Sequence, residues 1–172
     1  FQGCTSLRKV VLPEHLTKIG IGAFQDCTAL QTMVLPDSVT ELGEDAFLGC
    51  TSLQKLVLSK NLKCIPQRAF YQCTSLNEIV IPSGVERIES QAFVQCSSLY
   101  ALSLPETVSY VGQNNFNGDT ALLSLTVYNP DCHLMTSDYE LPKQVLLYCY
   151  QDSSLYWYAQ QYGRKYVLLD TP

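Results

Sequence analysis

A repeat of 23 residues runs through most of the chain and limits the folds that it can adopt. Phenylalanine recurs at this spacing at Phe1, Phe24, Phe47, Phe70, Phe93 and Phe116. Leucine keeps the same spacing at Leu7, Leu30, Leu53, Leu76, Leu99 and Leu122. A fixed period in this range is typical of solenoids, in which similar units stack because no single unit can bury its own apolar side. The repeat therefore predicts a stack of about six turns.

Each unit carries one strand signal. After the leucine, two apolar residues flank a single residue and a proline often follows, as in Met33-Val34-Leu35-Pro36. This alternation is typical of a half-buried strand, and proline ends a strand because it lacks the backbone N–H. A second apolar pair, such as Val39 and Leu42, precedes the next phenylalanine. We expect an α/β fold with one parallel β-sheet and one or two helical turns per unit on the convex side.

Five of the eight cysteines follow the same period. This cysteine column consists of Cys4, Cys27, Cys50, Cys73 and Cys96, and Asp119 stands where a sixth cysteine would be. Side chains in register in a parallel stack point the same way, so neighbouring thiols are not aimed at each other for disulfide formation. Free cysteine is among the most buried residue types. We therefore expect the column to be a set of small buried side chains rather than reactive groups.

The pattern Phe-x-x-Cys-x-x-Leu, followed by an alternating strand and proline, resembles the BspA-like family of bacterial leucine-rich repeats. The stretch 70–76, FYQCTSL, follows this pattern closely. The resemblance implies a leucine-rich-repeat array of five to six turns over 1–128, followed by an irregular turn and C-terminal cap over 129–172. In the cap, 145–148, 153–163 and 166–169 resemble the strand, helix and strand that close such arrays, with Gly163 as the helix stop.

The same resemblance implies a non-catalytic module on the surface of a bacterium or secreted from it. Its role would be adhesion or recognition of another protein or of a host or extracellular macromolecule. Two alternatives are a structural spacer that presents other domains and an intracellular interaction scaffold. A start at Phe1 suggests a fragment, which we expect to be monomeric.

Composition excludes some classes of partner. With 47% hydrophobic and 16% charged residues the chain can bury a core. Its net charge of -5 and pI near 4.9 provide no basic surface, which disfavours nucleic acid and anionic membranes as partners. The sequence contains no run of 18 apolar residues, so direct membrane insertion is not expected. The chain also has no P-loop, zinc-protease or serine-hydrolase motif, and we predict neither catalytic residues nor a metal or cofactor site.

Three cysteines lie outside the column. Cys64 occupies the place of Glu41 and Arg87 in neighbouring units, where we expect an exposed, free thiol. Cys132 and Cys149 flank the aperiodic segment and are candidates for a disulfide, with free thiols as the alternative. Adjacent residues on an extended chain point apart, so a catalytic pair of Cys132 with its neighbour His133 is disfavoured.

The outward-facing positions of the predicted strands form the candidate partner-binding face. The residues concerned are Val11, Val34, Val57, Val80, Lys55 and Tyr100. Valine is also favoured in strands for steric reasons alone, which is the simpler explanation. Contiguous exposed apolar residues on a solenoid are, however, typical of protein-binding surfaces, and tyrosine is a common anchor.

Tyrosines and the single tryptophan gather near the C-terminus, for example at Tyr156, Trp157 and Tyr158. Aromatic clusters can line carbohydrate sites. The last turn of a solenoid must also be covered, and amphipathic aromatic side chains suit that position, so we favour a capping role.

Overall fold

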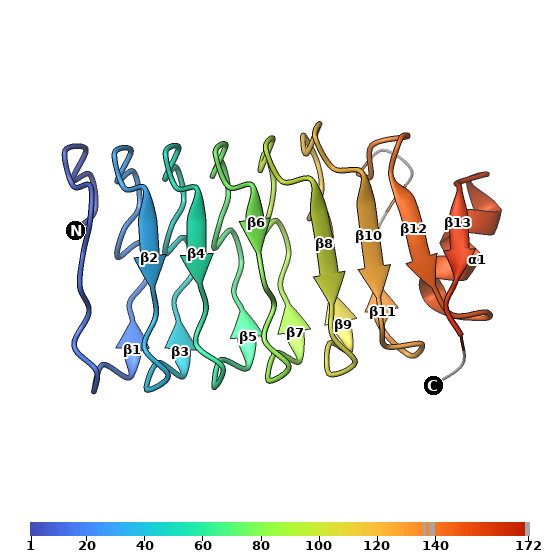
Figure 1. Cartoon of the computed structure of the whole chain (residues 1–172), viewed down its shortest axis with the longest axis horizontal. Helices are drawn as coiled ribbons and strands as arrows, with labels where there is room; N and C mark the ends of the chain where they lie inside the picture. Colours follow the sequence, from blue (N-terminus) through green and yellow to red (C-terminus); the bar gives the residue numbers. More distant parts are fainter. Residues whose placement is uncertain (136, 138–139, 171–172) are drawn as a thin grey trace.

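The computed structural model describes residues 1–135, 137 and 140–170 and has the shape of a stack of similar turns (Figure 1). From the second turn of the repeat onward, each turn contributes one strand to a front sheet and a two-residue strand to a return sheet behind it. The first turn contributes one strand to the return sheet and an isolated bridge at Lys9 to the front. All pairings between the described strands are parallel, and those within the repeat are displaced by its 23 residues, as Leu56 pairs with Met33 and with Ile79. The solenoid predicted from the 23-residue period is confirmed.

The front sheet consists of two hydrogen-bonded ladders that follow one another along the stack. The first contains β2 (Thr32–Val34), β4 (Lys55–Val57) and β6 (Glu78–Ile79). The second contains β8 (Ala101–Leu104), β10 (Ser124–Val127), β12 (Leu146–Cys149) and β13 (Tyr166–Leu168). Buried residues alternate with outward-facing ones, as in β4, where Leu56 is buried between Lys55 and Val57. The sheet thus continues past residue 128 without interruption.

The return side of each turn differs from the expectation of helical turns. It holds two-residue strands. β1 (Lys18–Ile19) pairs with β3 (Glu41–Leu42). A second ladder contains β5 (Cys64–Ile65), β7 (Arg87–Ile88), β9 (Tyr110–Val111) and β11 (His133–Leu134). The second apolar pair of each unit therefore forms part of a second parallel sheet, so the chain has strands on two sides of the core rather than on one. These pairs alternate exposed and buried side chains, as at Glu41 and Leu42.

Compact turns, and not helix, connect each return strand to the next front strand. Two positions in every turn adopt a positive φ: one column is Gly22, Asp45, Arg68, Gln91 and Asn114, and the other is Gly3, Asp26, Gly49, Gln72, Gln95 and Gly118. A left-handed residue interrupts a right-handed helix. Two such residues, four positions apart in each connecting turn, therefore prevent the helical turn that the sequence pattern predicted.

The core is built from columns of identical side chains. Phe24, Phe47, Phe70 and Phe93 are buried, and successive rings from Phe1 onward lie 5.4 to 6.0 Å apart between centroids. Beside them, the thiols of Cys27, Cys50, Cys73 and Cys96 are fully buried, as predicted. Each donates to the carbonyl of the phenylalanine 26 residues earlier, at 3.1 to 3.3 Å. Cys4 is exposed because it belongs to the first turn.

The C-terminal segment closes the stack. Its predicted strand, helix and strand are confirmed as β12, α1 (Ser154–Gln161) and β13. Ser153 caps the helix by accepting from the Tyr156 N–H, and Gly163 has the positive φ of a helix stop. α1 buries Leu155, Tyr158 and Ala159 against the end of the core.

Arg164 fixes this cap to the aperiodic segment that precedes it. Its side chain is buried, and one guanidinium nitrogen donates to the Leu141 carbonyl and to the Tyr158 hydroxyl, both at 3.0 Å. A second nitrogen donates to the Pro142 carbonyl. The bond to the buried Leu141 carbonyl gives this group a donor, whereas the Pro142 carbonyl also accepts from the Val145 N–H. In the described residues, no helix has the length and apolar character needed to cross a membrane.

Candidate protein-binding face

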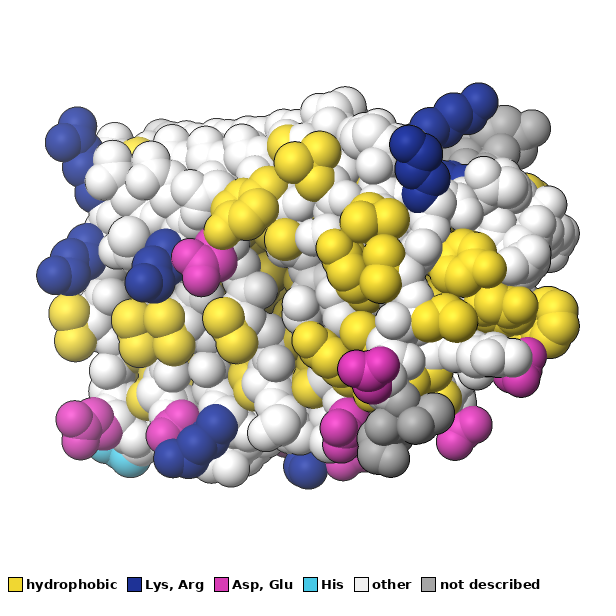
Figure 2. Space-filling model, turned by 45° about the vertical axis from the view of Figure 1, so that its right-hand side comes forward, with side chains coloured by type: hydrophobic (Ala, Val, Ile, Leu, Met, Phe, Trp, Pro, Cys, Tyr) yellow, Lys and Arg dark blue, Asp and Glu magenta, His cyan; other side chains and the backbone are white. Residues whose placement is uncertain are grey.

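The predicted valines form a continuous row on the outside of the front sheet. Val11, Val34, Val57 and Val80 are between 42% and 85% exposed, and Val34 pairs directly with Val57 in the ladder. The residues that flank them along each strand, such as Leu56 and Leu58, are buried in the core. Figure 2 shows this row crossing the surface of the stack. We call these four residues the valine row.

Lys55 and Tyr100 border the valine row. Lys55 is exposed on β4, in register between Thr32 and Glu78. Tyr100 is 51% exposed just before β8 and lines the same hollow as Val80. All six predicted residues therefore lie on one side of the molecule. Charged residues of both signs flank the valine row: Arg8 and Lys9 at its N-terminal end are basic, and Glu78 is acidic.

Shallow hollows lie along this face between successive turns. One of about 360 Å³ includes Val11 and Val34, and another of about 380 Å³ includes Val57 and Val80. A third, of about 320 Å³, joins Val80 to Tyr100 and Tyr128. Prolines 36, 82 and 105 contribute to their walls. Such open, largely apolar hollows suit side chains of a protein partner better than an enclosed small substrate.

The sequence also predicts Ser103 and Thr126 in the outward column, and the structure extends it beyond them to Tyr148 and Val167. The outward column continues from Ser103 through Thr126 and Tyr148 to Val167, because these residues pair in register in β8, β10, β12 and β13. Leu123 and Tyr128 are exposed next to it. In Figure 2 hydrophobic side chains cover this end of the surface as well. Aligning the predicted strand at 145–148 with those of the repeat would have placed Tyr148 on the face.

The buried thiols are poor nucleophiles in this structure. Burial raises the pKa of Cys50 to about 12 and that of Cys132 to about 11, and it raises the pKa of Cys73 and of Cys96 well above the usual value. Because the thiolate is the reactive form of cysteine, these groups stay inert at neutral pH. The buried thiols of the cysteine column pack in the core, and each donates one hydrogen bond to a phenylalanine carbonyl.

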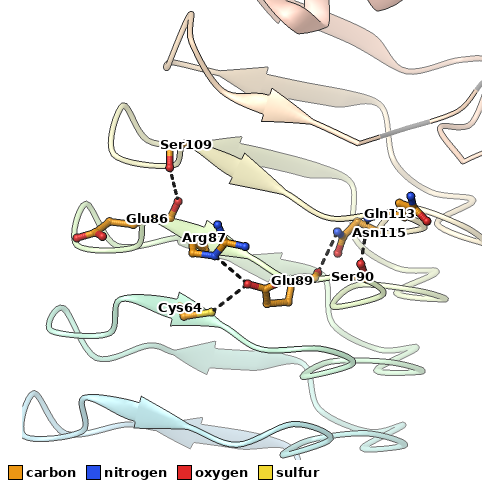
Figure 3. Close-up of polar contacts among 8 residues, drawn as sticks. All are labelled: Cys64, Glu86, Arg87, Glu89, Ser90, Ser109, Gln113 and Asn115. Atoms are coloured by element: carbon orange, nitrogen blue, oxygen red, sulfur yellow. Dashed lines mark hydrogen bonds and ion pairs between the residues drawn. The ribbon is translucent and has the colours of Figure 1, made fainter.

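Cys64 is free but half-buried, so the prediction of an exposed thiol was wrong. Figure 3 shows its side chain beside Glu89 and Arg87 of the neighbouring turn. The Cys64 Sγ lies 4.0 Å from Glu89 Oε1, and this carboxylate is paired with Arg87 Nε at 2.9 Å. The Arg87 guanidinium in turn lies over the Tyr110 ring, 4.2 Å from its centroid. Burial, and then the negative charge of Glu89, raise the pKa of Cys64. This thiol is therefore less reactive than an exposed one.

The proposed disulfide is not formed in this structure. Cys132 and Cys149 are both free and buried, and burial raises the pKa of each. Cys132 lies at the entry to β11, where its carbonyl accepts from the Ser154 hydroxyl of the cap helix. Cys149 is an inward-facing residue of β12 in the front sheet. The Ser154–Cys132 hydrogen bond links the aperiodic segment to the cap helix.

The structure does not bring Cys132 and His133 together as a catalytic pair. His133 is exposed and its ring stacks on Tyr110, with centroids 6.2 Å apart, whereas Cys132 points into the core. The two side chains thus lie on opposite sides of the strand. Among the described residues, no three or more His, Cys, Asp and Glu side chains are grouped so that they could hold a metal ion.

The comparisons with known proteins agree with this architecture. A family model for the BspA-type leucine-rich repeat region matches residues 1–123 in six copies. A search of curated proteins gives no significant match.

Solved structures of bacterial leucine-rich-repeat proteins are similar. A leucine-rich cell surface protein of Faecalibacterium prausnitzii is 31% identical, with a TM-score of 0.65, over 68% of this chain and 31% of its own. A leucine-rich-repeat protein of T. pallidum is 28% identical, with a TM-score of 0.69, over 92% of this chain and 84% of its own. A leucine-rich-repeat protein of Bacteroides ovatus, 21% identical with a TM-score of 0.52 over 98% of this chain and 56% of its own, shares the fold. The chain thus spans under a third of the Faecalibacterium protein.

Proposed function

Because the chain belongs to the BspA-type leucine-rich-repeat family, we propose that it is a binding module that recognises another protein through the valine row and the aromatic side chains beside it. The observation that carries this proposal is the row itself. Four valines at equivalent positions of successive turns are exposed together, next to Tyr100 and Tyr128. Solenoids bind partners through such extended faces.

The energetics favour a protein partner. The valine side chains are held rigidly by the sheet, so binding costs little ordering of this surface. Covering them removes apolar area from water, which contributes roughly 25 cal/mol for each Å². Tyrosines at the border supply a large contact area with few rotatable bonds. The open hollows between turns accept apolar side chains of the partner.

We further propose that binding takes place at a bacterial surface or outside the cell, as in adhesion. Support comes from the Faecalibacterium relative, which is described as a cell surface protein. The same function needs no catalytic residue: the buried, high-pKa thiols and the scattered histidines are compatible with a surface that binds and does not react.

The double variant Val57→Glu/Val80→Glu tests the proposal. Burying two carboxylates in an apolar contact is costly, so we expect the dissociation constant to rise about a hundredfold or more, which corresponds to about 2.7 kcal/mol. The ligand would first be identified by screening the protein against a panel of purified secreted and cell-surface proteins. Biolayer interferometry then gives the dissociation constants of wild type and variant.

The matched control is Ile21→Glu/Thr51→Glu. Both residues are exposed in the connecting turns, away from the valine row, and the change in net charge is the same. This control should bind within about threefold of wild type. Equal affinity of Val57→Glu/Val80→Glu and wild type, with unchanged circular dichroism, would remove the valine row from the binding surface.

A further inference from the structure

Asp119 is a carboxyl group in a place where the repeat has a thiol. It follows Cys96 by 23 residues and is completely buried. Its Oδ1 accepts a hydrogen bond from the Cys96 N–H at 2.8 Å. Its Oδ2 has no hydrogen-bond partner among the described residues, although it too is buried. A buried ionised oxygen without a donor would be strongly disfavoured.

The cysteine column indicates which group Oδ2 bonds to. In the preceding turns each thiol donates to the carbonyl of the phenylalanine 26 residues earlier, as Cys73 does to Phe47 and Cys96 does to Phe70. The same 26-residue spacing makes the Phe93 carbonyl the equivalent acceptor for Asp119. A carboxylate has no proton to donate and would face the lone pairs of this carbonyl. Only the neutral acid, with a proton on Oδ2, can repeat the bond that the thiols make.

Asn115 makes the sixth turn a polar junction. It replaces the alanine of earlier units and is completely buried. Its Oδ1 accepts from the Ala92 N–H at 2.9 Å, and its Nδ2 donates to the carbonyls of Gly112 and Glu89 at 2.7 and 3.1 Å. Figure 3 shows the side chain reaching toward Glu89. Asn115 and Asp119 thus both bind main-chain N–H groups of the fifth turn.

The cap packs on the other side of this junction. Gln144 donates to the carbonyls of Thr120 and Leu122, which follow Asp119 closely in the sequence. The charged groups of this layer are engaged elsewhere or face water. Glu140 accepts from the Asn114 N–H, Arg164 bonds to the carbonyls of Leu141 and Pro142, and Lys143 is exposed.

The surroundings of Asp119 favour its neutral form. The titratable group that faces it from the preceding turn is the Cys96 thiol, whose own pKa is raised by burial. Burial raises the pKa of Asp119 to about 8, against the opposing effect of the Cys96 N–H bond.

We infer that Asp119 is a proton-dependent contact between the fifth and sixth turns: as a neutral acid it donates from Oδ2 to the Phe93 carbonyl, and its ionisation weakens the array where the cap begins. In the unfolded chain an aspartate ionises near pH 3.9. The folded state therefore retains a proton that the unfolded state releases, and stability falls as the pH rises from about 4 to about 8. Above the folded-state pKa this stabilisation is lost.

Asp119→Asn provides the test, because the amide can accept from Cys96 and donate to Phe93 at every pH. Urea unfolding would be followed from pH 5 to pH 9 for both proteins. Relative to the variant, the unfolding constant of the wild type should rise about tenfold per pH unit between pH 5 and 7 and level off above about pH 8. Asp119→Cys, which restores the column, should behave like the asparagine variant.

Parallel curves of stability against pH for wild type and Asp119→Asn would overturn the inference. If neither variant folds, the wild type alone decides: a stability that does not change between pH 5 and pH 8 contradicts a proton held at Asp119. Hydrogen exchange at the Cys96 amide adds a local measurement. Its protection should fall through the same pH range more than that of the Cys50 amide, after correction for intrinsic exchange.

Discussion

Removal of residues 145–172 is expected to leave a chain that aggregates or fails to fold. The deletion removes β12, α1 and β13, and it uncovers the core residues against which they pack, among them Leu125, which pairs with Leu147. It also removes Arg164, whose guanidinium holds the carbonyls of Leu141 and Pro142. A solenoid that ends on an uncovered apolar turn loses stability and solubility.

Size-exclusion chromatography and circular dichroism measure this outcome. A soluble, monomeric deletion variant with the strand signal of the intact chain would show that 145–172 is not a cap.

Point variants separate the contributions of individual cap side chains to stability. Arg164→Ala should destabilise by about 3 kcal/mol, because it removes the hydrogen bonds of a buried guanidinium and leaves the buried Leu141 carbonyl without this donor. Trp157→Ala should cost less than about 0.5 kcal/mol, since this side chain is mostly exposed on the same helix.

Phe70→Ala should destabilise the protein by about 3 to 5 kcal/mol. The Phe70 ring is completely buried between Phe47 and Phe93, with centroids 6.0 and 5.4 Å away. Truncation opens a cavity that the surrounding turns cannot close, because each is held to its neighbours by main-chain bonds such as Phe70 N–H to the Ala92 carbonyl. The loss combines the transfer free energy of the ring with the cost of the cavity.

The first ring of the same stack supplies the control for Phe70→Ala. Phe1 stacks on Phe24 at 5.5 Å but is largely exposed at the N-terminal end. Phe1→Ala should therefore cost less than about 1 kcal/mol in urea unfolding at constant pH. Similar losses for the two variants would mean that burial within the stack does not determine the stability of the array.

Much of the fold could be predicted because the repeat fixes the register. Phe24, Phe47 and Phe70 mark equivalent points of successive turns, and the structure stacks them as the period requires. The alternation around Met33 and Leu56 also identified the buried side of the front strands correctly. These features depend on side-chain burial, which a sequence pattern reports directly.

The return side was harder to predict because the sequence carries few signals of its backbone conformation. Two-residue strands such as β3 carry too short an alternation to be distinguished from a loop. The positive-φ columns contain glycine at Gly22 and Gly49 but arginine or glutamine at Arg68 and Gln72, so no single residue type reveals them. The parallel main-chain bonds of the stack hold these residues in a conformation that their side chains do not favour.

The binding face was predicted only over the regular part of the array. Val57 and Val80 share the 23-residue spacing, whereas 22 residues separate Leu125 from Leu147 and 19 separate Leu147 from Tyr166. The change of spacing concealed that Tyr148 and Val167 continue the same outward column. The half-burial of Cys64 was equally invisible, because it depends on Glu89 and Arg87 from the neighbouring turn.

The most direct test of the binding face is site-specific photocrosslinking. A photoreactive benzoyl-phenylalanine would replace Val80, Tyr148 or Ile21 in separate proteins, each mixed with the ligand found in the panel screen. We predict strong crosslinks from position 80 and position 148, which lie on the front sheet, and none from position 21, which is exposed in a connecting turn. Crosslinking from position 21 with none from position 80 would contradict the assignment of binding to the front sheet.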